Sequence, residues 1–144
     1  MTTVEGSSSI ARPPGDVFAF VCDVRNEPRW HTDLLEARLT SEGPIDKGST
    51  FAVRFKPLMG QSEGTLTVSE YEPPRRVVLL GQIGRMAPTV ILTVEPEGHG
   101  SRFTRRVEME MPGLMGLIAP LMVGMFRKRN AGFAANLKRV LETG

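Results

Sequence analysis

The hydrophobic residues of this chain follow two different spacings, one over its middle and one near its end. From residue 35 to residue 111, apolar and polar residues alternate in short segments, separated by turn-forming residues such as Gly43-Pro44. Alternation with a period of two is typical of a strand that buries one face. Six such strands joined by short turns predict an antiparallel meander. The expected strands cover residues 35–40, 51–56, 65–69, 77–83, 90–95 and 102–111.

The last segment, Pro112 to Gly144, carries a long helical pattern. On a helical wheel with about 100° per residue, an apolar stripe forms around Phe126. Two polar residues, Arg129 and Asn130, lie inside this stripe. A curved sheet wrapped around the helix would cover both apolar surfaces, so the pattern predicts an α+β fold. The residues on the face of Phe126 are Met122, Arg129, Asn130, Phe133, Leu137 and Val140.

The start of the chain predicts smaller elements. Residues 3–12 alternate weakly and are expected to form a first strand. Pro13-Pro14 breaks that strand and opens a short helix over residues 17–24. Asn26-Glu27-Pro28 ends or restarts the helix, and Trp30-His31 follows in a loop or a single turn. We expect residues 1–144 to form one domain, because a chain of this length folds around one core.

Composition narrows the class of protein. Hydrophobic residues make up 40% of the chain and charged residues 24%, which is ordinary for a soluble globular domain. The single cysteine, Cys22, excludes an internal disulfide and fits the reducing cytoplasm. No signal peptide pattern is present, and the longest uncharged run, Met111 to Phe126, is short for a membrane span. We therefore expect a cytoplasmic protein.

Charge and motifs exclude several kinds of partner. The net charge of +2 comes with scattered arginines, so no nucleic-acid partner is expected. Two histidines and one cysteine, spread over the chain, predict no metal site. The chain also lacks a phosphate loop, a dinucleotide-binding glycine pattern and a Ser-His-Asp set. We expect no cofactor.

Several local signatures stand in a particular order along almost the whole chain. The chain resembles the START-like, Bet v 1-like (SRPBCC) superfamily, in its polyketide cyclase/dehydrase branch. That resemblance implies a helix-grip fold: a curved antiparallel sheet of about seven strands around a long C-terminal helix, with two short helices after the first strand. It also implies a carrier of hydrophobic ligands or lipids, a cyclase, or a protein without known activity. The signatures are Pro13-Pro14 to Val17-Phe18, Asp23 to Trp30-His31, Gly48 to Phe51, Glu70 to Arg76, Gly100 to Thr104, and Met111-Pro112-Gly113.

Arg105 is the strongest candidate for a ligand-binding residue. It is in phase with Phe103 and Val107, on the face expected to look toward the long helix. A buried unpaired charge is costly, so Arg105 needs a carboxylate, a carbonyl or an anionic ligand group as its partner. The acid in phase on the same face is Glu70. The alternatives are a structural Arg105–Glu70 pair, or a bulge that turns Arg105 outward.

The other candidate residues would form walls or polar contacts of the same pocket. Asn130 can both donate and accept hydrogen bonds, whereas Arg129 can instead reach solvent past the edge of the stripe. One interpretation places Trp30 and His31 at the pocket rim, with His31 as a general base; the other, more ordinary one places His31 in a solvent-facing loop. Methionines and phenylalanines serve either as cavity wall or as core filler. The candidate binding residues are Trp30, Phe55, Glu70, Arg105, Met109, Met122, Phe126, Arg129, Asn130 and Phe133; no catalytic residue is assigned.

The stretch from Leu114 to Phe126 is apolar on all sides, which a simple helix grip does not require. Pro120 suggests a short turn over residues 113–118 and a main helix that starts near residue 120. The loop at Pro57–Gly60, a second subunit or a membrane surface could cover the extra apolar area. The leading hypothesis is a soluble protein that binds a small apolar molecule between sheet and helix. The alternatives are a polyketide cyclase or dehydratase without metal or nucleotide cofactor, or an interaction protein that uses Leu114–Phe126.

Overall fold

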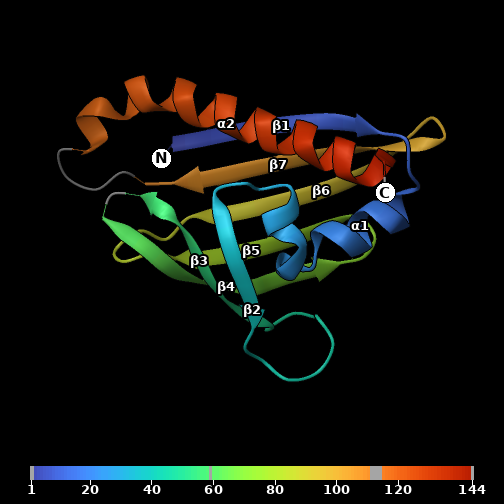
Figure 1. The fold of residues 1–144 in the computed structure, drawn as a ribbon, viewed down its shortest axis with the longest axis horizontal. Coiled ribbons are helices and arrows are strands. Elements are labelled where there is room, and N and C mark those ends of the chain that lie inside the picture. Colours follow the sequence, from blue (N-terminus) through green and yellow to red (C-terminus); the bar gives the residue numbers. More distant parts are fainter. Residues whose placement is uncertain (1, 59, 111–114, 144) are drawn as a thin grey trace.

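The sheet of this protein is one antiparallel layer of seven strands. The computed structural model describes residues 2–58, 60–110 and 115–143. The strands are ordered β1-β7-β6-β5-β4-β3-β2, so every neighbouring pair from β2 to β7 is also consecutive in sequence. This confirms the predicted meander and the first strand (Figure 1). The strands are β1 (Thr2–Ile10), β2 (Leu34–Leu39), β3 (Thr50–Leu58), β4 (Gln61–Glu72), β5 (Arg76–Gln82), β6 (Thr89–Glu97) and β7 (Gly100–Met109).

The two short helices lie between β1 and β2 and cover part of the concave face of the sheet. Helix α1 (Pro14–Val21) has proline in its first turn, where a missing N–H costs nothing. The 3-10 helix η1 (Val24–Arg29) is capped by Asp23, whose side chain accepts a hydrogen bond from the backbone N–H of Arg25. The turn after η1 buries Trp30 against Phe103, with ring centroids 5.6 Å apart. Together these contacts hold the η1 segment against the sheet.

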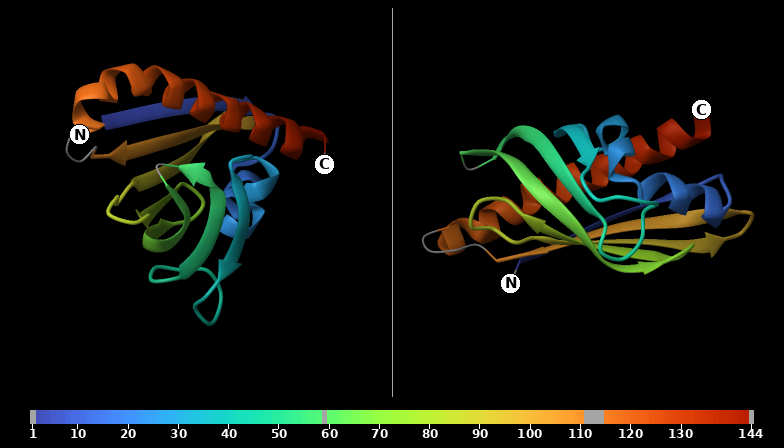
Figure 2. Two further views of the ribbon diagram at one scale, coloured as in Figure 1. Left: turned by 60° about the vertical axis from the view of Figure 1, so that its left-hand side comes forward. Right: turned by 90° about the horizontal axis from the view of Figure 1, so that it is seen from below.

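The long C-terminal helix α2 (Met115–Thr143) runs along β1 and β7, and the sheet curls away beneath it (Figure 2). It is one helix that continues through Pro120, so the expectation of a separate short turn before residue 120 is wrong. Residues 111–114, where part of that turn and the end of the last strand were predicted, lie outside the described residues. The buried face of α2 includes Asn130, Phe133 and Leu137, as the helical wheel predicted.

Gly6 sets how closely α2 approaches the sheet. It pairs with Arg105 in the register of β1 with β7. A Cβ atom at Gly6 would lie 3.0 Å from the backbone nitrogen of Ala131 and 3.1 Å from the carbonyl carbon of Asn130. Such contacts are too tight for an ordinary side chain, so the absence of a Cβ lets α2 lie directly on β1 at this level. Asn130 is thereby brought within reach of Arg105.

Two β-bulges change which residues face inward. The ladder between β2 and β3 shifts between Leu34 and Glu36, and Leu34 is buried while Leu35 is 43% exposed. The predicted alternation in that segment began on the wrong residue for this reason. The ladder between β4 and β5 shifts between Val68 and Glu70. A bulge adds one residue to one strand and so reverses the inward and outward phase beyond it.

Candidate functional site

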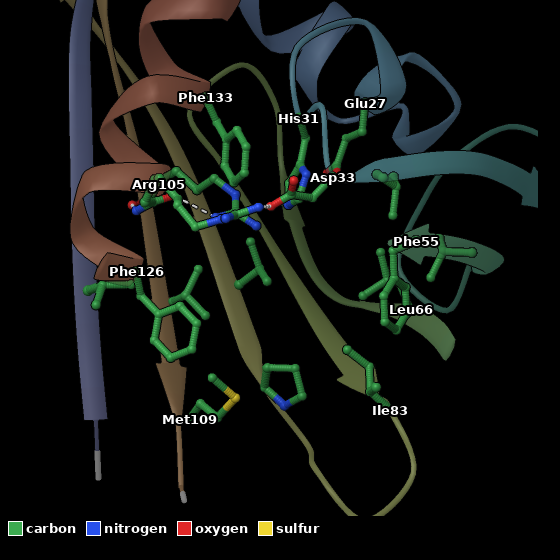
Figure 3. A pocket seen from close by; sticks show the side chains of 18 of the residues that line it. Glu27, His31, Asp33, Phe55, Leu66, Ile83, Arg105, Met109, Phe126 and Phe133 are labelled. Atoms are coloured by element: carbon green, nitrogen blue, oxygen red, sulfur yellow. Dashed lines mark hydrogen bonds and ion pairs between the residues drawn. The ribbon is translucent and has the colours of Figure 1, made fainter. Parts of the chain in front are cut away.

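A pocket of about 300 Å³ lies between the concave face of the sheet and α2. Its lining residues come from β1, from η1 and the segment after it, from β2 to β7 with the loop between β5 and β6, and from α2. In Figure 3 the polar side chains Arg105, His31, Glu27 and Asp33 lie at one end. Apolar side chains, Met109 among them, line the rest. The volume is at the lower end of what ligand pockets usually offer, which suits one small organic molecule.

The apolar part of the pocket is made by inward-facing strand residues and by the underside of α2. Strand alternation places Val53 and Phe55 of β3, and every second residue of β7 from Arg105 to Met109, toward the pocket. Exposed lining residues lie mainly on β3 and α2, namely Lys56, Pro57, Met125 and Arg129, so the pocket opens between these two elements. The apolar lining residues include Val53, Phe55, Leu66, Leu79, Ile83, Met86, Val90, Val107, Met109, Phe126 and Phe133.

Arg105 is buried at the polar end, with 8% of its surface exposed. Its Nη1 donates a hydrogen bond to Oδ1 of Asn130, and Asn130 Nδ2 donates to the backbone carbonyl of Arg105 at 2.8 Å. The guanidinium carbon also lies 5.7 Å from the centre of the Phe133 ring, a cation–π distance. Burial lowers the pKa of Arg105, and the negative charges of Glu27 and Asp33 oppose that effect. A guanidinium stays protonated at neutral pH, so a fixed positive charge stands inside the pocket.

Two titratable groups face this charge from the η1 side. Burial raises the pKa of Glu27 to about 7, although nearby Arg105 acts in the opposite direction. Burial, with Arg105 as the next cause, lowers the pKa of His31 to about 3, so the imidazole is neutral. The His31 ring stacks on Phe133 with centroids 4.0 Å apart, and among the described residues its Nδ1 finds no hydrogen-bond partner. Both groups are confined beside the guanidinium in a poorly solvated space.

Asp33 joins α2 to the segment before β2 at the pocket mouth. Nε of Arg129 donates to Oδ2 of Asp33 at 3.0 Å, and Lys56 Nζ lies 3.9 Å from the other oxygen. Arg129 is half exposed, which agrees with the sequence interpretation that it reaches solvent past the stripe edge. The hydrogen bond and charge of Arg129 hold the pKa of Asp33 below its usual value, against the opposing effect of burial. This ion pair is a surface contact beside the opening.

The structure brings most of the predicted site residues into one place. The residues that line the pocket are Phe55, Arg105, Met109, Phe126, Arg129, Asn130 and Phe133. Arg105 faces inward as its phase predicted, but its polar partner is Asn130 and not Glu70. Their roles in binding stay predictions.

Glu70 does not belong to the pocket. It follows the bulge between Val68 and Glu70, so it turns outward, is exposed, and pairs with Arg76 at 3.1 Å. The expectation failed because period-two counting from Val68 assumes an unbroken ladder.

Trp30 and Met122 are also absent from the lining of the pocket. Trp30 is fully buried, and its indole packs into the core against Phe103, while the neighbouring His31 faces the pocket. Met122 is half-buried and lies one turn before Phe126, toward the start of α2. The expected rim position of Trp30 was therefore wrong.

Sequence reasoning missed Glu27 and Asp33 among the charged lining residues, and also Lys56 at the pocket mouth. Glu27 stands next to Pro28, and that pair was interpreted only as a helix break. Its inward direction depends on the 3-10 geometry of η1, which no periodic pattern in so short a segment reveals. For Asp33 the sequence offers one weak hint of a place in the site, namely its position two residues after His31.

Comparison with known proteins identifies the family. The chain matches the family described as "Polyketide cyclase / dehydrase and lipid transport" over residues 1–142. The chain belongs to this family. The protein named Toxin Rv0910, from Mycobacterium tuberculosis, is 25% identical to this chain over 130 residues. The alignment covers 88% of this chain and 89% of that protein.

Solved structures support the fold of this member of the family. Ara h 8.0201 superposes with a TM-score of 0.72 at 17% identity, covering 99% of this chain and 98% of that one. DynU16, from the dynemicin biosynthetic locus, gives a TM-score of 0.71 at 22% identity. This chain is covered completely but spans only 48% of DynU16, about half of its length. The likeness confirms the Bet v 1-like helix-grip fold that the sequence predicted.

The described residues give little support for the other kinds of site. Within residues 2–58, 60–110 and 115–143, no three His, Cys, Asp or Glu side chains come together as a metal site requires. Nor does any helix in that part of the chain combine the length and apolar character needed to cross a membrane. The apolar stretch Leu114–Phe126 lies partly outside the described residues; within it, Leu121 is 82% exposed and Met125 is 50% exposed.

Proposed function

We propose that this protein binds one small, largely apolar organic molecule in the pocket between the sheet and α2. The observation that supports the proposal is the pocket itself: an apolar space of about 300 Å³ with one buried polar end, opening between β3 and α2. Protein interiors are normally packed as tightly as organic crystals, so a space of this size between packed layers calls for an occupant. The family description, which names lipid transport, cyclases and dehydrases, is consistent with such a ligand.

The division of the pocket suits a molecule with an apolar body and one polar group. Apolar walls supply the free energy of binding, on the order of 25 cal/mol per Å² of buried apolar surface. A few fixed polar groups set the orientation of the ligand. Here Arg105 and Asn130 are fixed by their reciprocal hydrogen bonds. The remaining candidate contacts, Phe55, Met109, Phe126 and Phe133, would form the walls.

A neutral fluorescent probe, N-phenyl-1-naphthylamine, tests this proposal without involving charge. We expect the protein to bind one probe per chain with a rise in fluorescence. Val107→Phe, which fills the pocket from β7, should weaken probe binding at least about tenfold. The matched control is Ile91→Phe on β6, because Ile91 is paired with outward-facing Arg106 and is not part of the pocket lining. Equal probe binding by wild type and both variants would refute the proposal.

One observation favours an enzymatic role as a second candidate. Glu27 is buried in the pocket with a pKa of about 7, the value that suits a general acid or base near neutral pH. A cyclase or dehydratase acting on a folded polyketide-like substrate would use such a carboxyl beside Arg105. Glu27→Gln separates the two roles: a carrier keeps its neutral ligand, whereas an enzyme keeps binding and loses turnover. Full turnover by this variant would exclude the enzymatic role of Glu27.

A further inference from the structure

The charged side chains that line the pocket do not balance one another. Three cations and two acids are present, and one of those acids, Asp33, is already shared by Arg129 and Lys56. The other acid is Glu27, which is only partly ionised near neutral pH. Excess positive charge therefore remains at the polar end. It is centred on Arg105, the most buried of the three cations.

The Arg105 guanidinium has hydrogen-bond donors to spare. Of its five N–H groups, one on Nη1 donates to Asn130, while the buried Nε has no partner among the described residues. No carboxylate of the described residues forms an ion pair with it: the ion pairs of Asp33 go to Arg129 and Lys56, and Glu27 acts on it only through its charge. A buried charge without an anionic partner costs several kcal/mol. Asn130 and Phe133 nevertheless hold the side chain in one place.

We propose that the ligand is an amphipathic carboxylic acid whose carboxylate pairs with Arg105 while its hydrocarbon part lies along the apolar walls. This inference rests on the proposed function and names the chemical class of its ligand. The planar guanidinium matches a carboxylate with two parallel N–H to oxygen bonds, which a neutral group cannot reproduce. The apolar residues begin beside the guanidinium, at Phe133 and Phe126, so a chain attached to the carboxylate enters them directly.

Other head groups fit these surroundings less well. An alcohol or amide would leave the buried charge of Arg105 without a counter-charge. A phosphate carries up to two negative charges and would bring the second one against Glu27 and Asp33 on the η1 side. A cationic head group would meet Arg105 itself. Because Arg129 and Lys56 already contact Asp33, Arg105 is the cation that a single ligand carboxylate would pair with.

The test compares three ligands that share one hydrocarbon chain: decanoic acid, decanol and decyl phosphate. Binding is measured by calorimetry at about pH 6, one unit below the Glu27 pKa of about 7, where decanoate is ionised and Glu27 is mostly protonated. We expect wild type to bind decanoate at least about tenfold more tightly than decanol, and more tightly than decyl phosphate. Arg105→Met should bring decanoate down to the affinity of decanol. Arg106→Met is the matched control, since Arg106 is the next residue on β7, faces outward and pairs with Glu5 and Glu108.

The outcomes separate this inference from the proposed function. Equal affinity of wild type for decanoate and decanol overturns the carboxylate assignment but leaves an apolar ligand pocket. Tighter binding of decyl phosphate assigns the site to a phosphate and also overturns it. If none of the three ligands binds and the neutral probe does not bind either, the proposed pocket function is refuted as well. Because the comparison within wild type decides the matter, a folding defect in Arg105→Met does not obscure the result; Arg105→Lys, which keeps the charge, should retain part of the preference.

The pH dependence gives a second readout at the same site. As pH rises through about 7, Glu27 becomes a carboxylate, competes for Arg105 and repels the ligand carboxylate. Decanoate affinity should therefore fall over this range, while decanol affinity stays constant, and Glu27→Gln should abolish the decrease. A decanoate affinity that is flat with pH in wild type contradicts the predicted contact. Three other titratable groups near Arg105 keep their charge state over this range: His31 is neutral, and Asp33 and Arg129 are ionised. Lys56 Nζ lies 3.9 Å from Asp33 at the pocket mouth.

Discussion

Glu27 should make this protein less stable as pH rises. Its pKa stands near 4.5 in the unfolded chain and is raised to about 7 by burial in the folded one. Below about pH 4.5 the carboxyl is protonated in both the folded and the unfolded state, so it does not lower the free energy of unfolding. Between the two values the unfolded state releases the proton first, so the free energy of unfolding falls. Above about pH 7 the loss is complete, and at 1.36 kcal/mol per pKa unit it is on the order of 3 kcal/mol.

The perturbation that isolates this effect is Glu27→Gln, which keeps the shape of the side chain but cannot ionise. Urea unfolding, followed by the fluorescence of the fully buried Trp30, gives the free energy of unfolding of wild type and variant at about pH 5 and pH 8. The difference, variant minus wild type, should grow by about 2–3 kcal/mol between these two conditions. Comparing the two proteins at each pH cancels the contributions of the titratable groups that they share to the free energy of unfolding.

Glu95→Gln serves as the control, because Glu95 is exposed on β6 and makes no part of the pocket. The free energy of unfolding of this control should differ from that of wild type by the same amount at both pH values. If the Glu27→Gln difference were equally independent of pH, the Glu27 carboxyl would be ionised in the folded protein. The description of a poorly solvated polar end, with an uncompensated Arg105, would then be wrong.

Three further substitutions test how the pocket is built. Gly6→Ala should push α2 away from β1 and cost about 1–3 kcal/mol of stability through overpacking. Asn130→Leu removes the acceptor for the buried Arg105 guanidinium, so the free energy of unfolding should drop by about 1.5–3 kcal/mol. Asp33→Asn breaks the half-exposed ion pair with Arg129 and should cost under about 1 kcal/mol, while ligand release becomes faster.

The same unfolding assay supplies the controls for these variants. Gly15→Ala adds a Cβ that meets no atom within 4 Å, so it should leave stability nearly unchanged. A Gly6→Ala variant as stable as Gly15→Ala would show that α2 does not rest on β1 at that level. If Asn130→Leu lost no more than Asp33→Asn, Asn130 would not be the group that satisfies Arg105. An unchanged ligand dissociation rate in Asp33→Asn would contradict a mouth bridged by this ion pair.

The sequence predicted the fold well because both spacings extend over many residues. The meander needs only local alternation and short turns, and the apolar stripe of α2 repeats over several helical turns. Both errors in facing direction on the strands came from a single inserted residue. The bulges at Leu34/Glu36 and Val68/Glu70 leave composition and spacing unremarkable, yet they turned Leu35 and Glu70 outward.

The candidate site was predicted only in part, for a related reason. Arg105 and Asn130 lie in long regular elements, so their phase identified them. Glu27 and His31 come from a six-residue 3-10 helix and the turn after it, where direction is decided by packing against the sheet. Trp30 was assigned to the wrong side of that turn for the same reason. The volume of the pocket could not be predicted, because a cavity is the space that all the surrounding side chains together leave unfilled.

The central claim, that the space between the sheet and α2 holds one amphipathic organic acid, is tested most directly by native mass spectrometry. The purified protein is offered an equimolar mixture of decanoic acid and decanol, and the bound species is identified by its mass. The account predicts one molecule per chain, with decanoic acid as the bound species in wild type and a largely empty Val107→Phe variant. A wild-type protein that takes up neither molecule would contradict the claim.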